Sequence, residues 1–399
     1  MVEPRTLKGF RDFLPREARK RQYVIETLKK AFELYGFEPL ETPVLEYEEI
    51  LAGKYGDEGE KLMYRFTDNG DRRVAMRYDQ TVPLARVVAQ YGNTSLPLPF
   101  KRYQIQNVWR AENTQKGRFR EFIQCDIDTV GTTSEISDAE ILAIVSNVYT
   151  QLGFSNIKIV INDRSIFQGL DTKAILIIDK LKKIGEEAVI KELATIGVSQ
   201  EQFENIKNAQ PTDNLQMIIS SAQLLGVPET ALQFDPTLAR GLDYYTGLIF
   251  EIICDDYPVG SLGGGGRYDN LIGMFQKNSI PAVGCAVGFD RTIEAMDTLN
   301  LFPSGLSTTN VLVTIFSPEY VEQSLGLTEI LRKQSVNTEI YLDTSAKMDK
   351  QLKYANKKNI PFVLILGPDE IKKEMVTVKN MSSGEQKTVI QKDILQNLS

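Results

Sequence analysis

The sequence has 399 residues and no histidine. This absence excludes every mechanism that needs an imidazole, namely Ser-His-Asp and Cys-His nucleophilic catalysis, histidine-ligated metal sites and a histidine general base. Any catalysis must therefore rest on carboxylates, arginines, hydroxyls, backbone groups or the substrate itself.

Cysteine is scarce as well, since only Cys125, Cys254 and Cys285 are present. They are scattered and lack CxxC spacing, so they predict buried free thiols in a reducing compartment rather than disulfides or a zinc site. Apolar runs are short: residues 362–366 fall far below the roughly 20 residues of a membrane-spanning helix. Residues 1–14 carry charges where a secretory signal is apolar. We therefore expect a cytoplasmic protein with no membrane association and no structural metal.

The length and the globular composition, with 42% hydrophobic and 25% charged residues, predict two or three domains. The net charge of −7 excludes a general nucleic-acid binder. Between residues 101 and 120, however, a single acid, Glu112, stands among the basic residues Lys101, Arg102, Arg110, Lys116, Arg118 and Arg120. This local cationic site predicts a specific polyanionic ligand.

The first half of the chain has the pattern of an antiparallel sheet with helices. Apolar residues at three- and four-residue spacing predict a helix over 15–35 that Gly36 ends. Alternating side chains predict hairpins over 63–78 and 102–128. The last strand of the second hairpin has one polar face, which indicates a sheet with one working face and which carries Phe122, Gln124, Asp126 and Asp128.

The second half begins with a stretch over about 165–232 whose periodicity predicts a helical insertion. Sheet returns over 243–254, and 280–296 reads as a strand that runs into a helix. The loop at 303–309 marks the expected domain boundary. Beyond it, alternating strands and helices predict a small α/β domain with largely parallel strands.

Two features point to chemistry. The glycine run at 263–266 fits no P-loop or dinucleotide fingerprint, so we interpret it as a strand or loop whose backbone, with Arg267 attached, approaches something closely. A single arginine in a strand is best explained as one partner of a surface ion pair. Four of them on separate segments, Arg110, Arg118, Arg240 and Arg291, can together grip a triphosphate.

Six ordered stretches carry a resemblance to the histidyl-tRNA synthetase family: KGFRDFLP (8–15), RYDQTVP (77–83), WRAENTQKGRFREFIQCDID (109–128), RGLDYYTG (240–247), GGGGRYD (263–269) and PAVGCAVGFDR (281–291). The motif RGLDYY is typical of the histidine branch, whereas the arginine-bearing strands are common to class II synthetases. Residues 349–367 resemble the family's anticodon-binding domain.

The resemblance implies an α/β (α+β) fold: a class II antiparallel sheet flanked by helices, with a helical insertion and a C-terminal α/β domain. The catalytic domain would span 1–305, the insertion about 165–232, and the anticodon-binding domain 309–399. It also implies a homodimer, with Pro43 in the interface segment. The implied activity is a histidine–tRNA ligase that uses ATP and Mg²⁺ to convert L-histidine into histidyl-adenylate and then charges tRNA-His.

Residue roles follow from the resemblance at matching positions. Asp79, Thr81 and Gln124 would hold the α-amino group, and Asp128 with the two tyrosines of RGLDYY would recognise the imidazole. The implied histidine-binding set is Asp79, Gln80, Thr81, Arg110, Gln124, Asp128, Arg240, Tyr244 and Tyr245. The implied ATP-binding set, in which Arg110 and Arg240 are catalytic, is Arg110, Glu112, Arg118, Arg240 and Arg291. Many bacterial members have glutamate in place of Asp79 and Asp128, and glutamate is commoner at Asp290.

The implied reaction needs no enzyme histidine, because the attacking carboxylate is already an anion and requires only positioning and charge neutralisation. Two alternatives stay open. One is a non-catalytic, synthetase-like regulatory subunit of ATP phosphoribosyltransferase, although such proteins usually lack the anticodon domain. The other is a class II synthetase for another amino acid, against which RGLDYY and Asp128 argue. The missing histidines would allow synthesis of the enzyme when histidine is scarce, but compositional drift explains them equally well.

Overall fold

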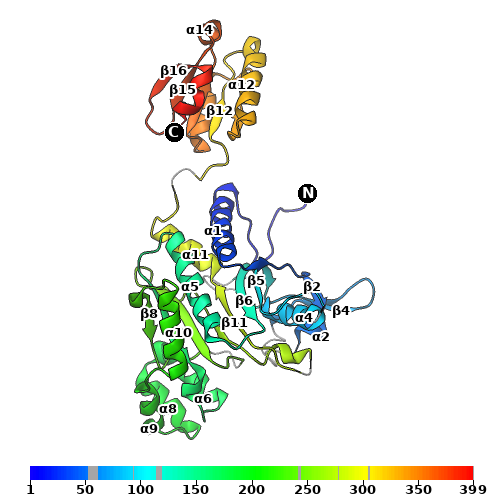
Figure 1. Cartoon of the computed structure of the whole chain (residues 1–399). Helices are drawn as coiled ribbons and strands as arrows, with labels where there is room; N and C mark the ends of the chain where they lie inside the picture. The colour runs from blue at the N-terminus through cyan, green and yellow to red at the C-terminus, as the bar shows by residue number, and fades with distance from the viewer. Residues whose placement is uncertain are drawn as a thin grey trace. The chain divides into compact units, whose positions relative to one another are not determined.

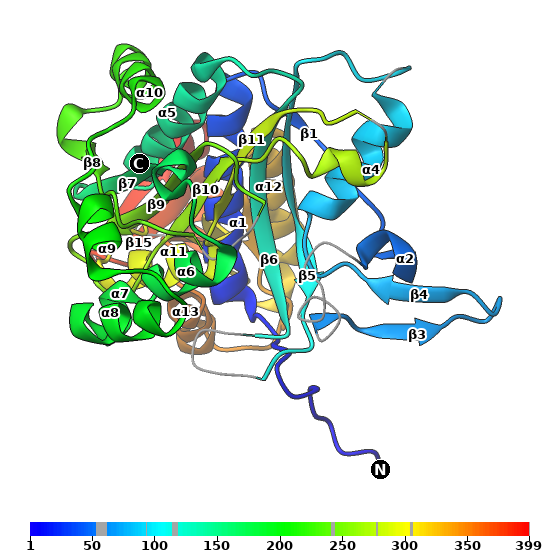
Figure 2. The same ribbon diagram turned by 90° about the horizontal axis from the view of Figure 1, so that it is seen from below.

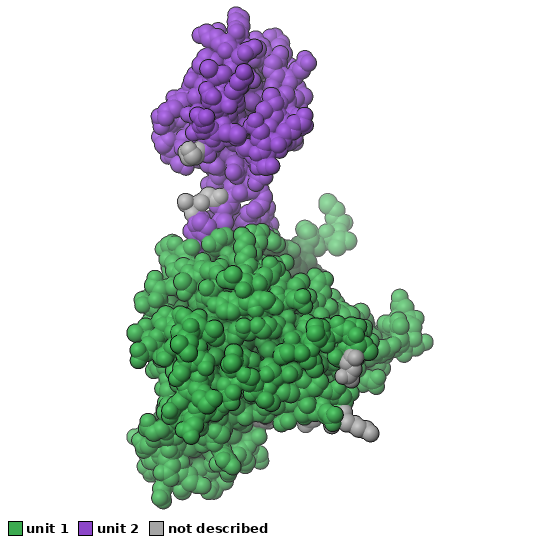
Figure 3. All heavy atoms as spheres, viewed as in Figure 1, with its two compact units in different colours: residues 1–13, 21–301 green, residues 14–20, 302–399 purple. Residues whose placement is uncertain are grey.

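The computed structural model describes residues 1–52, 62–92, 94–113, 119–240, 244–276, 278–303 and 306–398. The chain divides into two compact units, one of residues 1–13 and 21–301 and one of residues 14–20 and 302–399 (Figure 3). All three cysteines are buried free thiols, which confirms that prediction. Among the described residues, no helix combines the length and the apolarity needed to cross a membrane.

The first unit is built on an eight-stranded sheet (Figures 1 and 2). Its inner six strands pair antiparallel, as the sequence predicts, and a short strand is added in parallel at each edge. In spatial order the strands are β1 (Glu38–Pro39), β5 (Phe100–Trp109), β6 (Glu121–Val130), β11 (Ala282–Val287), β10 (Gly263–Arg267), β9 (Leu248–Cys254), β7 (Ile157–Asp163) and β8 (Leu232–Phe234).

Three long helices support this sheet. α1 (Pro15–Leu34) buries Val24, Leu28 and Phe32 at helical spacing, and Gly36 follows it with a φ of +75° that favours glycine. α5 (Glu135–Gln151) packs against β6, β7 and β11, and α11 (Phe289–Thr298) packs against β6. The hydroxyl of Tyr149 in α5 donates to the carbonyl of Leu262 at 2.8 Å, which ties the helix to the segment before β10. The strands that carry the polar side chains are thereby held on a rigid support.

A second, smaller sheet and several short elements complete the first half of this unit. The sheet contains β2 (Leu45–Tyr47), β4 (Arg73–Met76) and β3 (Arg65–Thr67), all antiparallel. The helices beside it are α2 (Glu48–Leu51) and α4 (Thr81–Tyr91). α4 begins directly after Asp79 and Gln80, so it places two of the predicted site residues at its N-terminus.

The chain between β7 and β8 is helical and gathers at one end of the unit (Figure 2). It contains α6 (Thr172–Ile178), α7 (Leu181–Ile184), α8 (Glu186–Thr195), α9 (Gln200–Lys207) and α10 (Asp213–Leu224), with the 3-10 turns η1 (Arg164–Phe167) and η2 (Glu229–Ala231) at its ends. A further 3-10 turn, η3 (Ile272–Met274), follows β10. Ile178, Leu193 and Phe203 are buried in a core that continues to Tyr245 and Tyr268, so the insertion packs on the segments that follow Arg240.

The second unit is a separate α/β fold with its own core. Its sheet contains, in order, β13 (Thr338–Ile340), β12 (Val311–Val313), β14 (Phe362–Ile365), β15 (Met375–Asn380) and β16 (Gln386–Ile390). Its helices are α12 (Val321–Lys333), α13 (Met348–Lys357) and α14 (Pro368–Lys372), with 3-10 turns η4 (Pro318–Tyr320) and η5 (Gln391–Asn397).

The expectation of largely parallel strands in this unit is wrong for its second half. β12 is parallel to β13 and β14, but β15 is antiparallel to both of its neighbours, β14 and β16. Between β15 and β16 the chain reverses in a hairpin turn: Asn380 Oδ1 accepts from the amides of Ser382 and Ser383 at 2.9 and 3.0 Å, and Gly384 takes a φ of +76°. These contacts reverse the chain without a crossover helix.

Candidate active site

A pocket of about 600 Å³ opens over the central strands of the eight-stranded sheet. It combines guanidinium, carboxylate and aromatic side chains with exposed strand backbone, and its described lining is Arg110, Glu112, Phe119, Phe122, Ile123, Gln124, Arg240, Glu251, Ser261, Gly263, Gly264, Ala286, Val287, Gly288, Phe289, Asp290 and Arg291. Segments far apart in the sequence therefore meet in one cavity of the size that small-molecule ligands occupy.

Three of the four predicted arginines line this pocket, and Arg118 lies outside the described residues. Arg110 donates from Nε to the carbonyl of Tyr78 at 3.0 Å. Arg240 pairs with Glu251, with 3.1 Å between Nη1 and Oε1, and Arg291 donates to the Ser261 carbonyl at 2.6 Å. Since a guanidinium carries five N–H donors, each arginine is oriented by one contact and keeps donors for an anion.

The glycine run explains how the arginines reach the sheet. It forms strand β10, paired on both sides, and not a loop. A Cβ on Gly264 would lie 2.9 Å from Nη1 of Arg240, and a Cβ on Gly266 would lie 2.9 Å from the ring of Tyr245. The sequence predicted that something approaches the backbone of the glycine run closely. In the structure, the side chains of Arg240 and Tyr245 make this approach, because the glycines have no Cβ atoms in the way.

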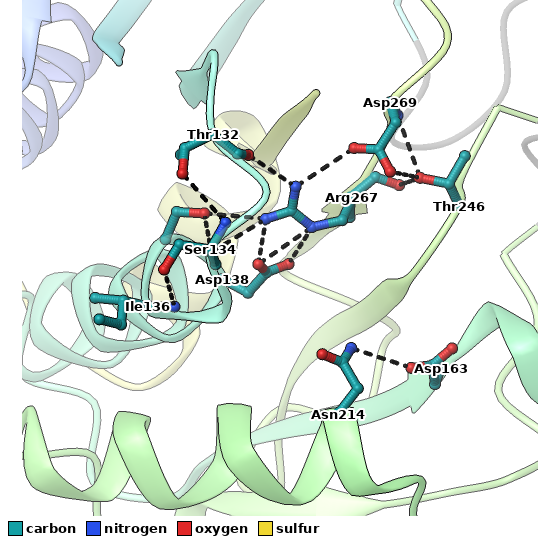
Figure 4. A network of polar contacts seen from close by, with 10 residues as sticks. Thr132, Ser134, Ile136, Asp138, Asp163, Asn214, Thr246, Arg267 and Asp269 are labelled. Carbon is teal, nitrogen blue, oxygen red and sulfur yellow. Dashed lines mark hydrogen bonds and ion pairs between the residues drawn. The ribbon is translucent and has the colours of Figure 1, made fainter. Parts of the chain in front are cut away.

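Arg267 serves the fold and is engaged away from the pocket. It pairs with Asp138, which is buried at the start of α5, and donates to the Thr132 carbonyl at 3.1 Å and to Ser137 Oγ at 3.0 Å (Figure 4). Burial raises the pKa of Asp138, and the hydrogen bonds and charge of Arg267 oppose that rise. This pair fixes the end of β10 to α5, so the residue that follows the glycines is structural.

The predicted histidine-binding residues divide into pocket-lining and supporting positions. Gln124 lines the pocket, and its Oε1 is buried with no hydrogen-bond partner among the described residues. Asp79 caps α4, since its Oδ1 accepts from the amide of Val82 at 3.3 Å. Gln80 is fully buried and donates from Nε2 to the carbonyls of Gln106 and Gln124, at 3.0 and 3.1 Å, which ties the start of α4 to β5 and β6. Thr81 is the first residue of that helix.

Asp128 is held in a buried cluster. It lies 2.7 Å from Nη2 of Arg102, and the hydroxyl of Tyr268 donates to its other oxygen. Gly284 pairs with it across the sheet and leaves its carboxylate room, because a Cβ there would lie 2.0 Å from Oδ1. Asp79, Thr81, Asp128, Tyr244 and Tyr245 are not among the described residues that line the 600 Å³ pocket.

The aromatic side chains beside this cluster pack against one another. The rings of Tyr244 and Tyr245 are 4.6 Å apart, and Tyr244 meets Tyr268 in a T-shaped contact at 5.8 Å. Tyr268 in turn contacts Asp128, so the two tyrosines of RGLDYY and the predicted imidazole-binding carboxylate belong to one connected group.

Sequence reasoning gave no role in histidine or ATP binding to four residues of this region: Arg102, Asp126, Glu251 and Tyr268. Asp126 is 4% exposed, lies 4.0 Å from Nη2 of Arg102, and accepts from Gln124 Nε2 at 2.7 Å. Burial raises its pKa to about 7; the charge of Asp128 adds to the rise, and Arg102 opposes it. Two sequence signals could have identified these residues. Asp126 lies in the polar row of β6, and Glu251 is the lone acid in the apolar strand β9.

The N-terminal segment and α1 hold residues of the pocket wall in place. Asp290, at the start of α11, binds two arginines: Arg11 at 2.9 Å and Arg21 of α1. The guanidinium of Arg11 lies 3.2 Å from the ring centroid of Phe119, which also lines the pocket. The aspartate in the place where glutamate is commoner is therefore held by a pair of cations, and KGFRDFLP has a direct structural function.

Comparisons with known proteins agree with this geometry. A family model described as histidyl-tRNA synthetase matches residues 9–195 and 177–292, and one described as anticodon binding domain matches residues 310–399. Histidine–tRNA ligase of Cytophaga hutchinsonii is 38% identical over the whole of both chains. The ligase of Wolinella succinogenes is 39% identical, with 98% of this chain and 96% of that protein covered.

Solved structures give the same result. Histidyl-tRNA synthetase from Nostoc sp. PCC 7120 matches with a TM-score of 0.90 and 30% identity, covering 100% of this chain and 99% of that one. An ATP phosphoribosyltransferase regulatory subunit/histidyl-tRNA synthetase from Bacillus halodurans shares the fold, with a TM-score of 0.73 and 22% identity over 91% of this chain and 99% of that one. The regulatory alternative is thus not the better supported one. The chain belongs to the histidyl-tRNA synthetase family and is a histidine–tRNA ligase.

Proposed function

We propose that the pocket over β6, β9, β10 and β11 is where this ligase activates L-histidine with ATP. The observation that carries the proposal is that Arg110, Arg240 and Arg291 line one cavity of about 600 Å³. Guanidinium groups bind phosphates and carboxylates in a bidentate manner, and three around one cavity match a triphosphate and an amino-acid carboxylate.

The ATP end of the pocket has five assigned side chains. Arg110 binds the α-phosphate and the histidine carboxylate, Arg240 binds the α-phosphate, and Arg291 with Arg118 binds the outer phosphates. Glu112 binds the adenine. Four of these side chains, those of Arg110, Glu112, Arg240 and Arg291, line the same pocket, which supports the assignment. The absence of a Cβ at Gly264 leaves room for Arg240 against the strand.

The histidine end has the opposite polarity. We assign the α-ammonium to Asp79, Thr81 and Gln124, whose buried Oε1 is an acceptor without a protein donor among the described residues. Asp128 binds the imidazole N–H beside the two tyrosines of RGLDYY. Because Arg102 and Tyr268 fix the carboxylate, a ligand that lacks the ring N–H would leave buried polar groups unpaired, and this rejects isosteres.

The activation step needs positioning and charge neutralisation. A carboxylate oxygen of histidine attacks the α-phosphorus, the bond from that phosphorus to the bridging oxygen breaks, and pyrophosphate leaves. No proton moves, because the nucleophile is already ionised. Arginines fixed in a pocket stabilise the charge that builds on the phosphorus oxygens without reorganising at the moment of reaction.

Mg²⁺ fits the donor set of the pocket. It keeps several waters and is usually held by substrate phosphates with one or two carboxylates. Glu251, on the pocket wall beside Arg240, is the carboxylate that would hold it together with the phosphates. When bound with ATP, the ion neutralises phosphate charge.

In the second step a terminal ribose hydroxyl of tRNA-His attacks the carbonyl carbon of the adenylate. The bond from that carbon to the phosphate oxygen breaks, AMP leaves, and a phosphate oxygen of the departing AMP takes the hydroxyl proton. An enzyme imidazole is not needed, in agreement with a sequence that has none. Residues 309–399 bind the anticodon, which the family model over 310–399 supports.

We further assign catalysis to residues 1–305, with the helical insertion at about 165–232, and place the protein in the cytoplasm as a homodimer. The division of the chain into units near residue 301 supports the boundary. Exposed apolar side chains near Pro43 support a dimer surface on the small sheet, namely Val44, Leu45, Tyr47 and Phe66. Buried free thiols fit a reducing compartment.

Arg240→Ala tests the proposal in histidine-dependent exchange of pyrophosphate into ATP. Loss of one charged donor to the transition state lowers kcat by about 10²- to 10³-fold. Lys180→Ala, which removes an exposed cation of the insertion paired with Glu192, serves as the control and retains full activity. Exchange by Arg240→Ala at the wild-type rate would mean that the chemistry takes place elsewhere.

A further inference from the structure

The side-chain amide of Gln124 is anchored at one end only. Gln124 and Asp126 are two residues apart on β6 and share a face. Nε2 of Gln124 donates to Oδ2 of Asp126 at 2.7 Å, while Oε1 is buried without a hydrogen-bond partner among the described residues. A carboxylate can only accept, so it selects the amide nitrogen and leaves the carbonyl oxygen as the free end.

The burial of Asp126 does not stabilise the fold. Asp126 is 4% exposed, and its Oδ1 has no hydrogen-bond partner in the described part of the chain. Nη2 of Arg102 is 4.0 Å from Oδ2 of Asp126 and lies closer to Asp128, at 2.7 Å. Burying a carboxylate this way costs several kcal/mol, and an apolar residue would avoid that cost.

The charges of the cluster point to the kind of ligand it favours. Two carboxylates, Asp126 and Asp128, share the single guanidinium of Arg102. When both are ionised, one negative charge is left over, close to a bare carbonyl acceptor on the pocket lining. An acceptor backed by negative charge attracts a cationic donor, and an ammonium group has that chemistry.

We propose that Asp126 is a positioning residue for the amino end of the substrate: it holds the Gln124 amide with Oε1 toward the pocket, so that the site selects an α-ammonium group. This inference rests on the proposed function, because it takes histidine as the ligand that meets Gln124. It adds a residue that acts through another residue and contributes no direct contact of its own.

The test compares two ligands that each keep the imidazole and only one of the two charged groups of histidine. Histamine carries the ring and the ammonium, whereas 3-(imidazol-4-yl)propionate carries the ring and a carboxylate without the ammonium. Both are measured as competitors of histidine in pyrophosphate exchange. We expect Asp126→Leu to raise the KM for histidine and the Ki of histamine by about 10- to 100-fold, the usual effect of losing a charged hydrogen bond. The Ki of the propionate and the KM for ATP stay within about twofold of wild type.

A conservative variant and a double variant separate positioning from structural damage. Asp126→Asn still offers an oxygen to Gln124 Nε2 and restores most of the histamine affinity. In a Gln124→Met background, Asp126→Leu weakens histamine binding no further, because its effect passes through the amide. If the KM for ATP of Asp126→Leu shows that this variant does not fold, Asp126→Ala is used in its place.

Equal losses for histamine and the propionate would overturn the proposal, since they would show general damage to the pocket. Additive losses in the double variant, or unchanged histamine affinity in Asp126→Leu, would overturn it as well. Failure of the proposed function has a different signature: the wild-type protein itself would not support exchange with histidine.

Discussion

A substitution of Gly284 gives the most specific prediction, because the space beside its Cα holds a hydrogen atom and nothing larger. Gly284 lies in β11 opposite Asp128 of β6 and Gly266 of β10. A Cβ at this position would lie 2.0 Å from Oδ1 of Asp128 and 2.6 Å from its Cγ, whereas ordinary contact begins at 3.4 Å. In Gly284→Ala the carboxylate must therefore move by more than 1 Å.

That movement breaks the cluster which orients the carboxylate. The 2.7 Å contact with Arg102 and the hydrogen bond from Tyr268 are both lost or stretched. A displacement of about 1 Å at a substrate-positioning group costs about 10²-fold in rate. We expect kcat/KM for histidine in pyrophosphate exchange to fall about 100-fold, with the KM for ATP changed less than about threefold.

Gly326→Ala is the matched control, since that glycine lies in α12 and an added Cβ meets nothing within 4 Å. It should exchange pyrophosphate at the wild-type rate. If Gly284→Ala keeps kcat/KM for histidine near the wild-type value, the position of the Asp128 carboxylate does not determine histidine binding, and the assigned imidazole site is wrong.

Three further perturbations follow from the same structure. Burial raises the folded-state pKa of Asp126 to about 7, above its unfolded value of about 3.9, so the stability that its protonated form contributes at low pH is lost as pH rises through 7. Relative to Asp126→Asn, the wild type should lose on the order of 1 kcal/mol of unfolding free energy between pH 6 and 8, measured by urea unfolding followed by the fluorescence of Trp109, the single tryptophan. A difference independent of pH would contradict this. Arg267→Met leaves Asp138 buried without its cation and should lower the unfolding free energy by about 3–5 kcal/mol in the same assay, an effect that adding Asp138→Asn should largely reverse. Arg11→Ala removes a partner of the pocket wall and should raise the KM for ATP about tenfold, whereas an unchanged KM would show that this contact is dispensable.

The local patterns of the sequence were sufficient for four of the six antiparallel strands, β5, β6, β9 and β11, but not for β7 and β10. Alternation over β5 and β6 and the strand-to-helix change at β11 are signals within ten or so residues, and the structure has these elements. The motif resemblance similarly located Arg110, Arg240 and Arg291, which share one pocket.

Contacts between distant segments were not predictable in this way. Nothing within KGFRDFLP shows that Arg11 pairs with Asp290, 279 residues away. Charge counting placed Arg102 in the cationic site of residues 101–120, but its position two residues into a buried strand turns it toward Asp128. The hairpin that ends the second unit was missed because its turn depends on Asn380 and a left-handed glycine rather than on a strong apolar pattern.

The central claim is that this chain activates histidine and no other amino acid. The most direct measurement is exchange of pyrophosphate into ATP with purified protein and Mg²⁺, tested separately with each of the twenty amino acids and followed by charging of tRNA-His. We expect exchange with histidine alone and transfer of that histidine to the tRNA. Exchange with a different amino acid, or none from folded protein, would contradict it.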